Sequence, residues 1–167
     1  MVPPVLQIRE ANNAEEYELI ARLADTIWRE HYIPIIGEGQ VSYMLERFQS
    51  AGAIEQQAAS GLRYYLLWHQ GKPAGYCAFE KRGEDLFLSK IYVLQSLRGL
   101  GLGKAAMQFV VDQARQENCR RITLTVNKFN TGSIAAYLRM GFRQGPPVQQ
   151  DIGGGYIMDD YLMILDL

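Results

Sequence analysis

Apolar residues in the first third of the chain recur every three or four positions, which is the spacing of helices with one buried face. The first of these helices begins after Asn13, a favourable N-cap residue. We expect it to end near Glu30, because Pro34 cannot donate a helical hydrogen bond. The apolar segment 31–39 is then predicted to be a loop. Two shorter helices are expected at 41–48 and 54–59.

From Arg63 onward the apolar period changes to that of strands. Turns that contain Gly71 and Gly83 separate three apolar segments, and such short connections predict an antiparallel meander. The strands of this meander are expected at 63–69, 74–81 and 86–93, with an additional edge strand at 5–9.

Helical and strand patterns alternate in the C-terminal half of the chain. A strand, a helix and a strand in succession predict a parallel pair with a right-handed crossover. No repeat, low-complexity segment or linker interrupts the order, so we expect one α/β domain over residues 1–167. The remaining elements are expected to be a helix over 101–118, a strand over 122–126, a helix over 131–140 that ends at Gly141, a strand from 142 and a last strand over 160–167.

Composition narrows the possible partners and the compartment. The net charge of −1 provides no electrostatic footprint for nucleic acid or an anionic membrane. The sequence contains no stretch of about eighteen uncharged apolar residues, so no transmembrane helix is expected. The segment Met1–Val5 lacks the basic region of a secretory signal, so a cytoplasmic location is expected. Cys77 and Cys119 belong to no metal-like cluster and are predicted to be small core residues, with no metal site.

A glycine-rich loop follows the predicted strand 86–93 and leads directly into a helix. The backbone N–H groups at a helix N-terminus carry partial positive charge and therefore suit a phosphate group. Glycines at 99, 101 and 103 remove the side chains that would keep a diphosphate away from the main chain. Arg98 and Lys104 add positive charge at the two ends of the loop.

Two familiar nucleotide-binding motifs do not fit this loop. A G-x-G-x-x-G fingerprint that starts at Gly99 would need glycine at position 104, which is Lys104. A G-x-x-x-x-G-K-[ST] loop that ends at Gly103-Lys104 would need glycine in place of Arg98 and a hydroxyl in place of Ala105. A turn that serves only tight packing is the alternative to a phosphate site.

The arrangement Arg98-x-x-Gly101-x-Gly103 comes shortly after Ile91-Tyr92-Val93, and a second segment, which contains Ser133, Tyr137 and Gly141, runs from Asn130 to Phe142. In this order, the two segments resemble the two signatures of the GNAT superfamily of N-acetyltransferases. The resemblance covers residues 85–142 well and the flanks more loosely. It implies the GNAT acyl-CoA N-acyltransferase fold: a mostly antiparallel sheet with one splayed parallel strand pair and helices on both faces.

The resemblance also implies that acetyl-CoA (coenzyme A) is the cofactor. The main chain of Ile91, Tyr92 and Val93 would bind the pantetheine arm and the thioester oxygen, with a backbone N–H as the oxyanion donor. Asn130 and Ser133 would contact the cofactor arm, although Asn130 also suits a helix N-cap. The diphosphate would be bound by the loop formed by Arg98, Gly99, Leu100, Gly101, Leu102, Gly103 and Lys104.

By the same resemblance, Tyr137 is the general acid that protonates the leaving thiolate. A phenol has an ordinary pKa near 10, so it carries its proton near neutrality. The alternative is that Tyr137 is an amphipathic core residue. No carboxylate lies within the strand 86–93, and we assign no general base.

The acceptor pocket of this superfamily is built from the first two helices, their connection and the last strands. A second resemblance, looser than the first, is to the PaiA-like polyamine acetyltransferases and lies in the segments Ile27–Tyr32 and Asp151–Asp160. Acidic residues beside aromatic rings suit a cationic amine, whereas the alternative is that Asp159 and Asp160 cap a hairpin and face water. The candidate substrate-binding residues are Trp28, Glu30, Tyr32, Glu80, Asp159 and Asp160.

These observations favour an enzyme that transfers an acetyl group from acetyl-CoA to a primary amine of a small molecule, with a polyamine as one candidate. One alternative is a protein N-terminal or lysine acetyltransferase. Another is a non-catalytic acyl-CoA sensor. The chain is expected to be a monomer or a homodimer, and the acyl-chain preference stays open.

Overall fold

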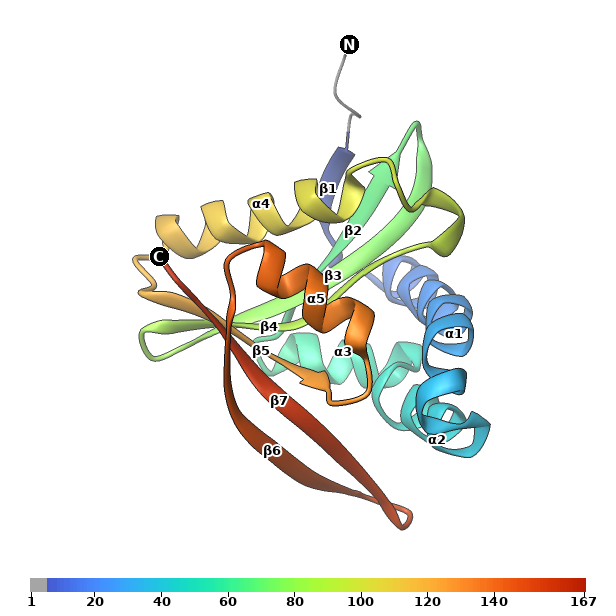
Figure 1. Cartoon of the computed structure of the whole chain (residues 1–167). Coiled ribbons are helices and arrows are strands. Elements are labelled where there is room, and N and C mark those ends of the chain that lie inside the picture. Colours follow the sequence, from blue (N-terminus) through green and yellow to red (C-terminus); the bar gives the residue numbers. More distant parts are fainter. Residues whose placement is uncertain (1–5) are drawn as a thin grey trace. The chain divides into compact units, whose positions relative to one another are not determined.

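The computed structural model describes residues 6–167 (Figure 1). In this part of the chain the strands form a seven-stranded sheet in the order β1-β2-β3-β4-β5-β7-β6. The elements are β1 (Leu6–Glu10), α1 (Ala14–Ile36), α2 (Glu38–Phe48), α3 (Ala51–Ala59), β2 (Arg63–His69), β3 (Lys72–Arg82), β4 (Asp85–Val93), a 3₁₀ turn (Gln95–Leu97), α4 (Leu102–Gln116), β5 (Arg121–Asn127), α5 (Thr131–Arg139), β6 (Arg143–Gly153) and β7 (Tyr156–Asp166).

The described residues divide into two compact units. The first comprises the residues up to Glu80 together with Lys90–Val110, and the second comprises Lys81–Ser89 together with Val111–Leu167. The boundary passes through β4 and α4. The start of β4 pairs with β5 in parallel, whereas β1 with β2, β2 with β3, β5 with β7 and β6 with β7 are antiparallel. The predicted mostly antiparallel sheet with one parallel pair is therefore confirmed.

In the first unit, helices cover both faces of the β2–β3 pair. The register places Leu66 opposite Tyr76 and Tyr65 opposite Cys77, so Tyr65 and Tyr76 point to opposite faces. Trp28 of α1 donates a hydrogen bond to Tyr76, and the ring of Phe109 of α4 lies 5.1 Å from that of Tyr65. We call these faces the α1 face and the α4 face.

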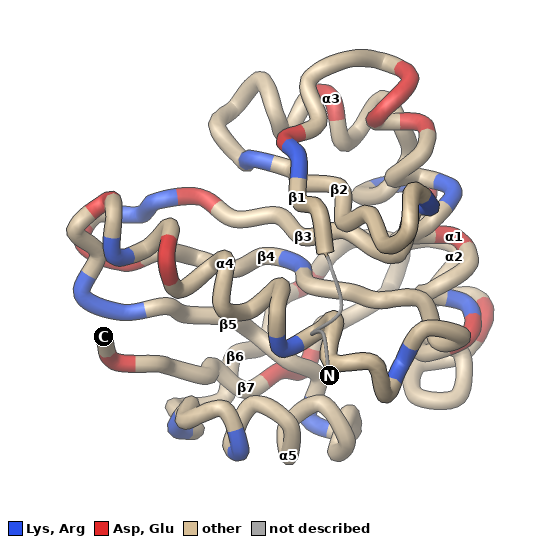
Figure 2. The backbone as a smooth tube through the Cα atoms, turned by 90° about the horizontal axis from the view of Figure 1, so that it is seen from above, with Lys and Arg blue, Asp and Glu red and all other residues tan. Residues whose placement is uncertain are grey.

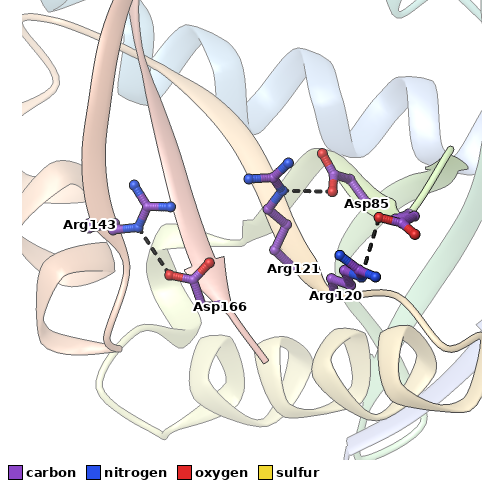
Figure 3. A network of polar contacts seen from close by, with 6 residues as sticks. Asp85, Arg120, Arg121, Arg143 and Asp166 are labelled. Carbon is purple, nitrogen blue, oxygen red and sulfur yellow. Dashed lines mark hydrogen bonds and ion pairs between the residues drawn. The ribbon is translucent and has the colours of Figure 1, made fainter.

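In the second unit, β6 and β7 form a long twisted hairpin (Figure 1). The parallel start of β4 and β5 carries exposed ion pairs, with Arg121 Nε 2.7 Å from Asp85 Oδ1 and Arg120 Nε 3.3 Å from Glu84 (Figure 3). Solvent screens ion pairs of this kind, so they contribute little to stability. The backbone bond from Arg120 N–H to the Glu84 carbonyl, at 2.7 Å, fixes the same register.

The structure corrects the predicted end of the first helix. The segment 31–39 is not a loop, because α1 continues to Ile36 with Pro34 inside it and α2 begins at Glu38. Pro34 lies in the last turn, where its missing N–H removes one helical hydrogen bond, and the helix continues for two more residues. Gly37, with φ of 86°, ends α1.

The other predicted elements are present, with shifted ends. The strand 63–69 is confirmed to the residue, and the Asn13 side chain accepts a hydrogen bond from Glu16 N–H as the predicted N-cap. The helix predicted at 54–59 begins earlier, at Ala51, because the Ser50 hydroxyl caps it. The last strand begins at Tyr156 and not at 160. The edge strand predicted at 5–9 corresponds to β1 (Leu6–Glu10). Its residue 5, like the rest of the segment Met1–Val5, lies outside the described residues.

Charge and thiol chemistry add little to the fold. Basic and acidic segments are interspersed along the backbone (Figure 2). Cys77 and Cys119 are buried free thiols, which confirms them as core residues, and burial raises the pKa of Cys77 to about 12. None of the helices within residues 6–167 has the length and apolar character needed to cross a membrane.

Candidate active site

The glycine loop joins β4 to α4 in the first unit. Gly99 and Gly101 have φ values of 85° and 78°, a conformation that strongly favours glycine. Gly103 does not have a positive φ, and a Cβ at this position would meet nothing within 4 Å. Neither the backbone nor the packing of the described residues therefore requires glycine at 103. Close approach of a ligand to the main chain would explain it.

The first turn of α4 presents main-chain amides beside this loop. Ala105 N–H donates to the Gly101 carbonyl at 3.1 Å, so the amides of residues 102–104 precede the helical hydrogen-bond ladder. Leu102 is 1% exposed, which means that its side chain packs in the core and only its main chain is placed to meet a ligand. Arg98 and Lys104 are exposed at the ends of the loop.

The end of β4 lies beside predicted acceptor residues. The half-buried ring of Tyr92 is 5.9 Å from that of Trp28 and 6.2 Å from that of Tyr32, measured between centroids. The hydroxyl oxygens of Tyr32 and Tyr92 are 3.0 Å apart and share a hydrogen bond. The structure thus brings together Trp28 and Tyr32, predicted for the acceptor, with Tyr92, predicted for the cofactor.

Trp28 is held by a buried chain of hydrogen bonds that sequence reasoning missed. Its indole N–H donates to the Tyr76 hydroxyl at 3.0 Å, and that hydroxyl donates to Gln49 at 2.6 Å. The Gln49 amide donates to Tyr64 at 3.1 Å, and Tyr64 donates to Gln57 at 2.6 Å. Burial raises the pKa of Tyr64 and Tyr76, so both phenols stay neutral. Trp28 is 4% exposed, and its fixed ring packs against those of Tyr32 and Tyr92.

Gln49→Ala is expected to lower the free energy of unfolding by about 2 kcal/mol, because the buried Tyr76 hydroxyl would lose its acceptor. Urea denaturation measures the change. Gln56→Ala is a matched control, since Gln56 is exposed on α3 and its replacement should change stability by no more than about 0.5 kcal/mol. Equal stabilities of the two variants would show that the buried chain contributes nothing.

Lys90 is a further titratable group in the first unit that sequence reasoning missed. Burial lowers its pKa to about 8, and the negative charge of Glu80 opposes this shift. Glu80, predicted for substrate binding, is half-buried on β3. Its carboxylate therefore acts electrostatically on Lys90. A lysine inside an apolar strand carried no sequence signal for this change.

In the second unit, Asn130 and Ser133 lie at the start of α5 and Tyr137 lies two turns later. Asn130 is 3% exposed and its side-chain oxygen accepts from Ser133 N–H at 3.4 Å, so its role as an N-cap is confirmed. Tyr137 is half-buried, with its ring 5.5 Å from that of Phe142. This packing fixes the ring while part of the residue stays accessible.

The adjacent acids of β7 have different environments. The carboxylate of Asp159 lies 2.8 Å from Lys128 Nζ, and the hydrogen bond from Lys128 lowers the pKa of Asp159. Asp160 is 6% exposed, and burial followed by the charge of Asp159 raises its pKa to about 6, against a hydrogen bond from Thr125. The alternative that both residues cap a hairpin and face water is wrong, because the hairpin turns at 154–155.

Asp160→Asn is expected to raise the free energy of unfolding at pH 7.5 by about 2 kcal/mol more than it does at pH 4, because one pKa unit corresponds to about 1.4 kcal/mol. A carboxyl with a raised folded-state pKa binds protons more tightly when folded, so its stabilising effect is present near pH 4 and is lost as the pH rises to about 6. Urea denaturation at both pH values measures the difference. Asp159→Asn is the matched control and should change stability in the opposite direction. A pH-independent effect of Asp160→Asn would contradict the assignment.

The family model described as "Acetyltransferase (GNAT) family" matches residues 20–142 of the chain. This chain is a member of that family. The match contains the glycine loop, the end of β4 and the whole of α5. Among residues 6–167, no group of three or more His, Cys, Asp or Glu side chains could hold a metal ion.

Sequence relatives of this family member match about half of its length. The 5-NmdU N-acetyltransferase of Pseudomonas phage PaMx11 is 42% identical over 80 residues, which are 47% of this chain and 55% of that protein. The streptothricin acetyltransferase of Streptomyces lavendulae is 30% identical over 90 residues, which are 53% of this chain and 48% of that protein. The chain thus spans about half the length of these relatives.

Solved structures share the fold over nearly the whole chain. The PaiA N-acetyltransferase from Thermoplasma acidophilum, in complex with coenzyme A, has a TM-score of 0.80 at 15% identity, covering 98% of this chain and 99% of that chain. The ribosomal-protein-S18-alanine N-acetyltransferase from Escherichia coli has a TM-score of 0.72 at 16% identity, covering 97% and 94%. At these identities the likeness concerns the fold and leaves the acceptor open.

Proposed function

We propose that this GNAT family member transfers an acetyl group from acetyl-CoA to a primary amine of a small molecule. The observation that carries the proposal is the glycine loop at the start of α4. Its amides precede the helical hydrogen bonds, and its Gly103 is unexplained by backbone conformation or packing. A diphosphate bound to these amides would use both features, because it needs N–H donors and close access to the main chain.

The proposed reaction is direct attack. The amine nitrogen bonds to the thioester carbon, the C–S bond breaks, and the sulfur leaves as a thiolate. A backbone N–H of Ile91, Tyr92 or Val93 stabilises the negative charge on the carbonyl oxygen. Tyr137 gives its proton to the thiolate, so that the products are an N-acetylated amine and free coenzyme A. The attacking amine must be neutral, and its surplus proton passes to solvent or to a base that we do not assign.

The acceptor amine is proposed to bind beside the paired hydroxyls of Tyr32 and Tyr92. Aromatic faces attract an ammonium group, and hydroxyl oxygens accept its hydrogen bonds. Glu30 is exposed in the last third of α1 and stays a candidate, although side chains two residues apart on a helix do not face each other. Asp159 is the weaker candidate for contact with a cation, because Lys128 already neutralises its charge. Asp160 and Glu80 stay candidates.

The names of the relatives suggest both kinds of acceptor. Two of them name 5-NmdU and streptothricin, and a structural neighbour names the alanine of a ribosomal protein. We favour a small amine, with a polyamine as the first candidate, because of the resemblance of Ile27–Tyr32 and Asp151–Asp160 to the PaiA-like group.

A panel of amines with acetyl-CoA tests the function. Spermidine, simple primary monoamines, and peptides with a free N-terminus or lysine are each incubated with the full chain while free thiol is measured. We expect release with at least one small amine and none with peptides. Release with peptides alone would indicate a protein acceptor. Coenzyme A binding without any release would indicate a sensor and would overturn the proposed activity.

A further inference from the structure

Gly75 in β3 has no space for a side chain. A Cβ at this position would lie 2.0 Å from the Tyr92 carbonyl oxygen and 3.0 Å from the Cα of Val93. Both neighbours are main-chain atoms, so no side-chain rotation could relieve the overlap. Gly75 does not have a positive φ, which means that its own backbone conformation does not require glycine. The close approach of the Tyr92 carbonyl is what requires it.

The carbonyl of Tyr92 stands out of the plane of the sheet. Gly75 pairs with Leu67 two positions from the Tyr65–Cys77 pair, so a side chain at 75 would point to the α4 face. The Tyr92 oxygen occupies that place. The ring of Tyr92, in contrast, packs 5.5 Å from the ring of Tyr76 on the α1 face.

The orientation of this carbonyl fixes that of the next N–H. The described chain has no cis peptide bonds, and a trans peptide is planar with its C=O and N–H pointing in opposite directions. Since the Tyr92 carbonyl points to the α4 face, the Val93 N–H is turned toward the α1 face. That is the face on which the hydroxyls of Tyr32 and Tyr92 pair.

A second contact anchors the same segment to β3. Leu94 N–H donates to the Ala74 carbonyl at 2.8 Å. Ala74 is an extra residue in the β2–β3 ladder, because Leu67 pairs with Gly75 and Trp68 pairs with Pro73. This is a β-bulge, a feature that redirects local backbone groups. The space left by Gly75 therefore admits the Tyr92 carbonyl at one end of the segment 92–94, and the bulge at Ala74 binds the Leu94 N–H at the other.

We propose that Gly75 is a positioning residue for acetyl transfer, whose missing side chain admits the Tyr92 carbonyl and so directs the Val93 N–H at the thioester oxygen. This inference rests on the proposed function, in which the main chain of residues 91–93 polarises the thioester. It adds the donor, Val93 N–H, and the residue on the neighbouring strand that orients it.

Gly75→Ala separates catalysis from cofactor binding. The added methyl would displace the Tyr92–Val93 peptide, so kcat should fall by about tenfold or more, within the range seen when an oxyanion donor is lost. The Kd of coenzyme A, which lacks the acyl carbonyl, should change by a smaller factor than kcat, because the glycine loop is untouched and only the pantetheine contacts of residues 91–93 are shifted. Thiol release gives kcat, calorimetry gives Kd, and circular dichroism reports folding. Gly52→Ala is the matched control, since a Cβ there meets nothing within 4 Å.

Leu94→Pro is the second variant. Leu94 has φ of −52°, which proline adopts, so the substitution removes the N–H bonded to Ala74 without imposing a new conformation. We expect a smaller fall in kcat than for Gly75→Ala, with coenzyme A affinity again less affected than kcat. If Gly75→Ala fails to fold, this variant decides, and a kcat within twofold of wild type overturns the proposal.

The outcomes also distinguish this proposal from the proposed function. Absence of thiol release by the wild-type chain with every amine overturns the function and this proposal with it. An active wild type with equal kcat in a folded Gly75→Ala variant overturns this proposal alone. Parallel loss of kcat and coenzyme A affinity would assign Gly75 a structural role only.

Discussion

Tyr137→Phe is expected to lower kcat by about 10² to 10³-fold, within the range of general acid–base catalysis. The phenylalanine ring keeps the packing against Phe142 and removes only the hydroxyl that would protonate the leaving thiolate. Coenzyme A affinity should stay within threefold of wild type, because the hydroxyl acts on the reacting sulfur and the diphosphate loop is unchanged. Thiol release under saturating acetyl-CoA measures kcat, and calorimetry measures affinity.

Tyr43→Phe is the matched control for this substitution. Tyr43 lies on α2, and its ring has Arg47 5.9 Å from its centroid, a contact that phenylalanine preserves. Its kcat should equal that of wild type. If Tyr137→Phe also retains full kcat, Tyr137 is a core residue of α5 and the leaving thiolate is protonated by another group.

Gly103→Ala is expected to weaken coenzyme A binding by about tenfold or more, which corresponds to 1.4 kcal/mol. The new methyl would stand where the diphosphate is proposed to approach the amides of α4. The protein itself should tolerate the change, because nothing lies within 4 Å of this Cβ and alanine favours a helix by up to about 1 kcal/mol over glycine. Calorimetry with coenzyme A measures the loss of affinity, and thermal unfolding should show no loss of stability.

Gly52→Ala provides the matched comparison, since Gly52 is also helical and also has open space around its Cβ. It should keep the wild-type affinity for coenzyme A. A folded Gly103→Ala variant that binds coenzyme A as tightly as Gly52→Ala would show that the loop is a packing turn, the alternative that its sequence also allows.

Elements set by local pattern could be predicted from the sequence. The strand 63–69 is a short run of aromatic and apolar residues between Gly61 and Gly71, so its limits follow from the chain alone. The end of α1 could not be predicted in this way. Pro34 removes one hydrogen bond to the preceding turn, yet α1 continues to Ile36, and the start of α2 at Glu38 depends on how the two helices pack.

The residues of the candidate site differ in the same way: some have a local sequence signal and others do not. Its glycine loop and its N-cap Asn130 have local sequence signals, and the structure confirms the cap. Gln49 and Gly75 have none, because each acts through a partner that is distant in the chain: Tyr76 for Gln49, and the Tyr92 carbonyl for Gly75. Contacts between residues that are distant in the chain decide such roles, and the hydrophobic periodicity of the sequence does not reveal those contacts.

Several expectations from the sequence stay predictions. These are the polyamine acceptor, the cytoplasmic location, the organisation as one domain, the monomeric or dimeric state, and the binding roles of individual site residues.

A crystal structure of the full chain with bound coenzyme A tests the central claim most directly. The account predicts that the diphosphate accepts hydrogen bonds from the main-chain amides of residues 101–104 and that the sulfur lies within hydrogen-bonding reach of the Tyr137 hydroxyl. Coenzyme A bound with its diphosphate away from the glycine loop, or with its sulfur out of reach of Tyr137, would contradict it.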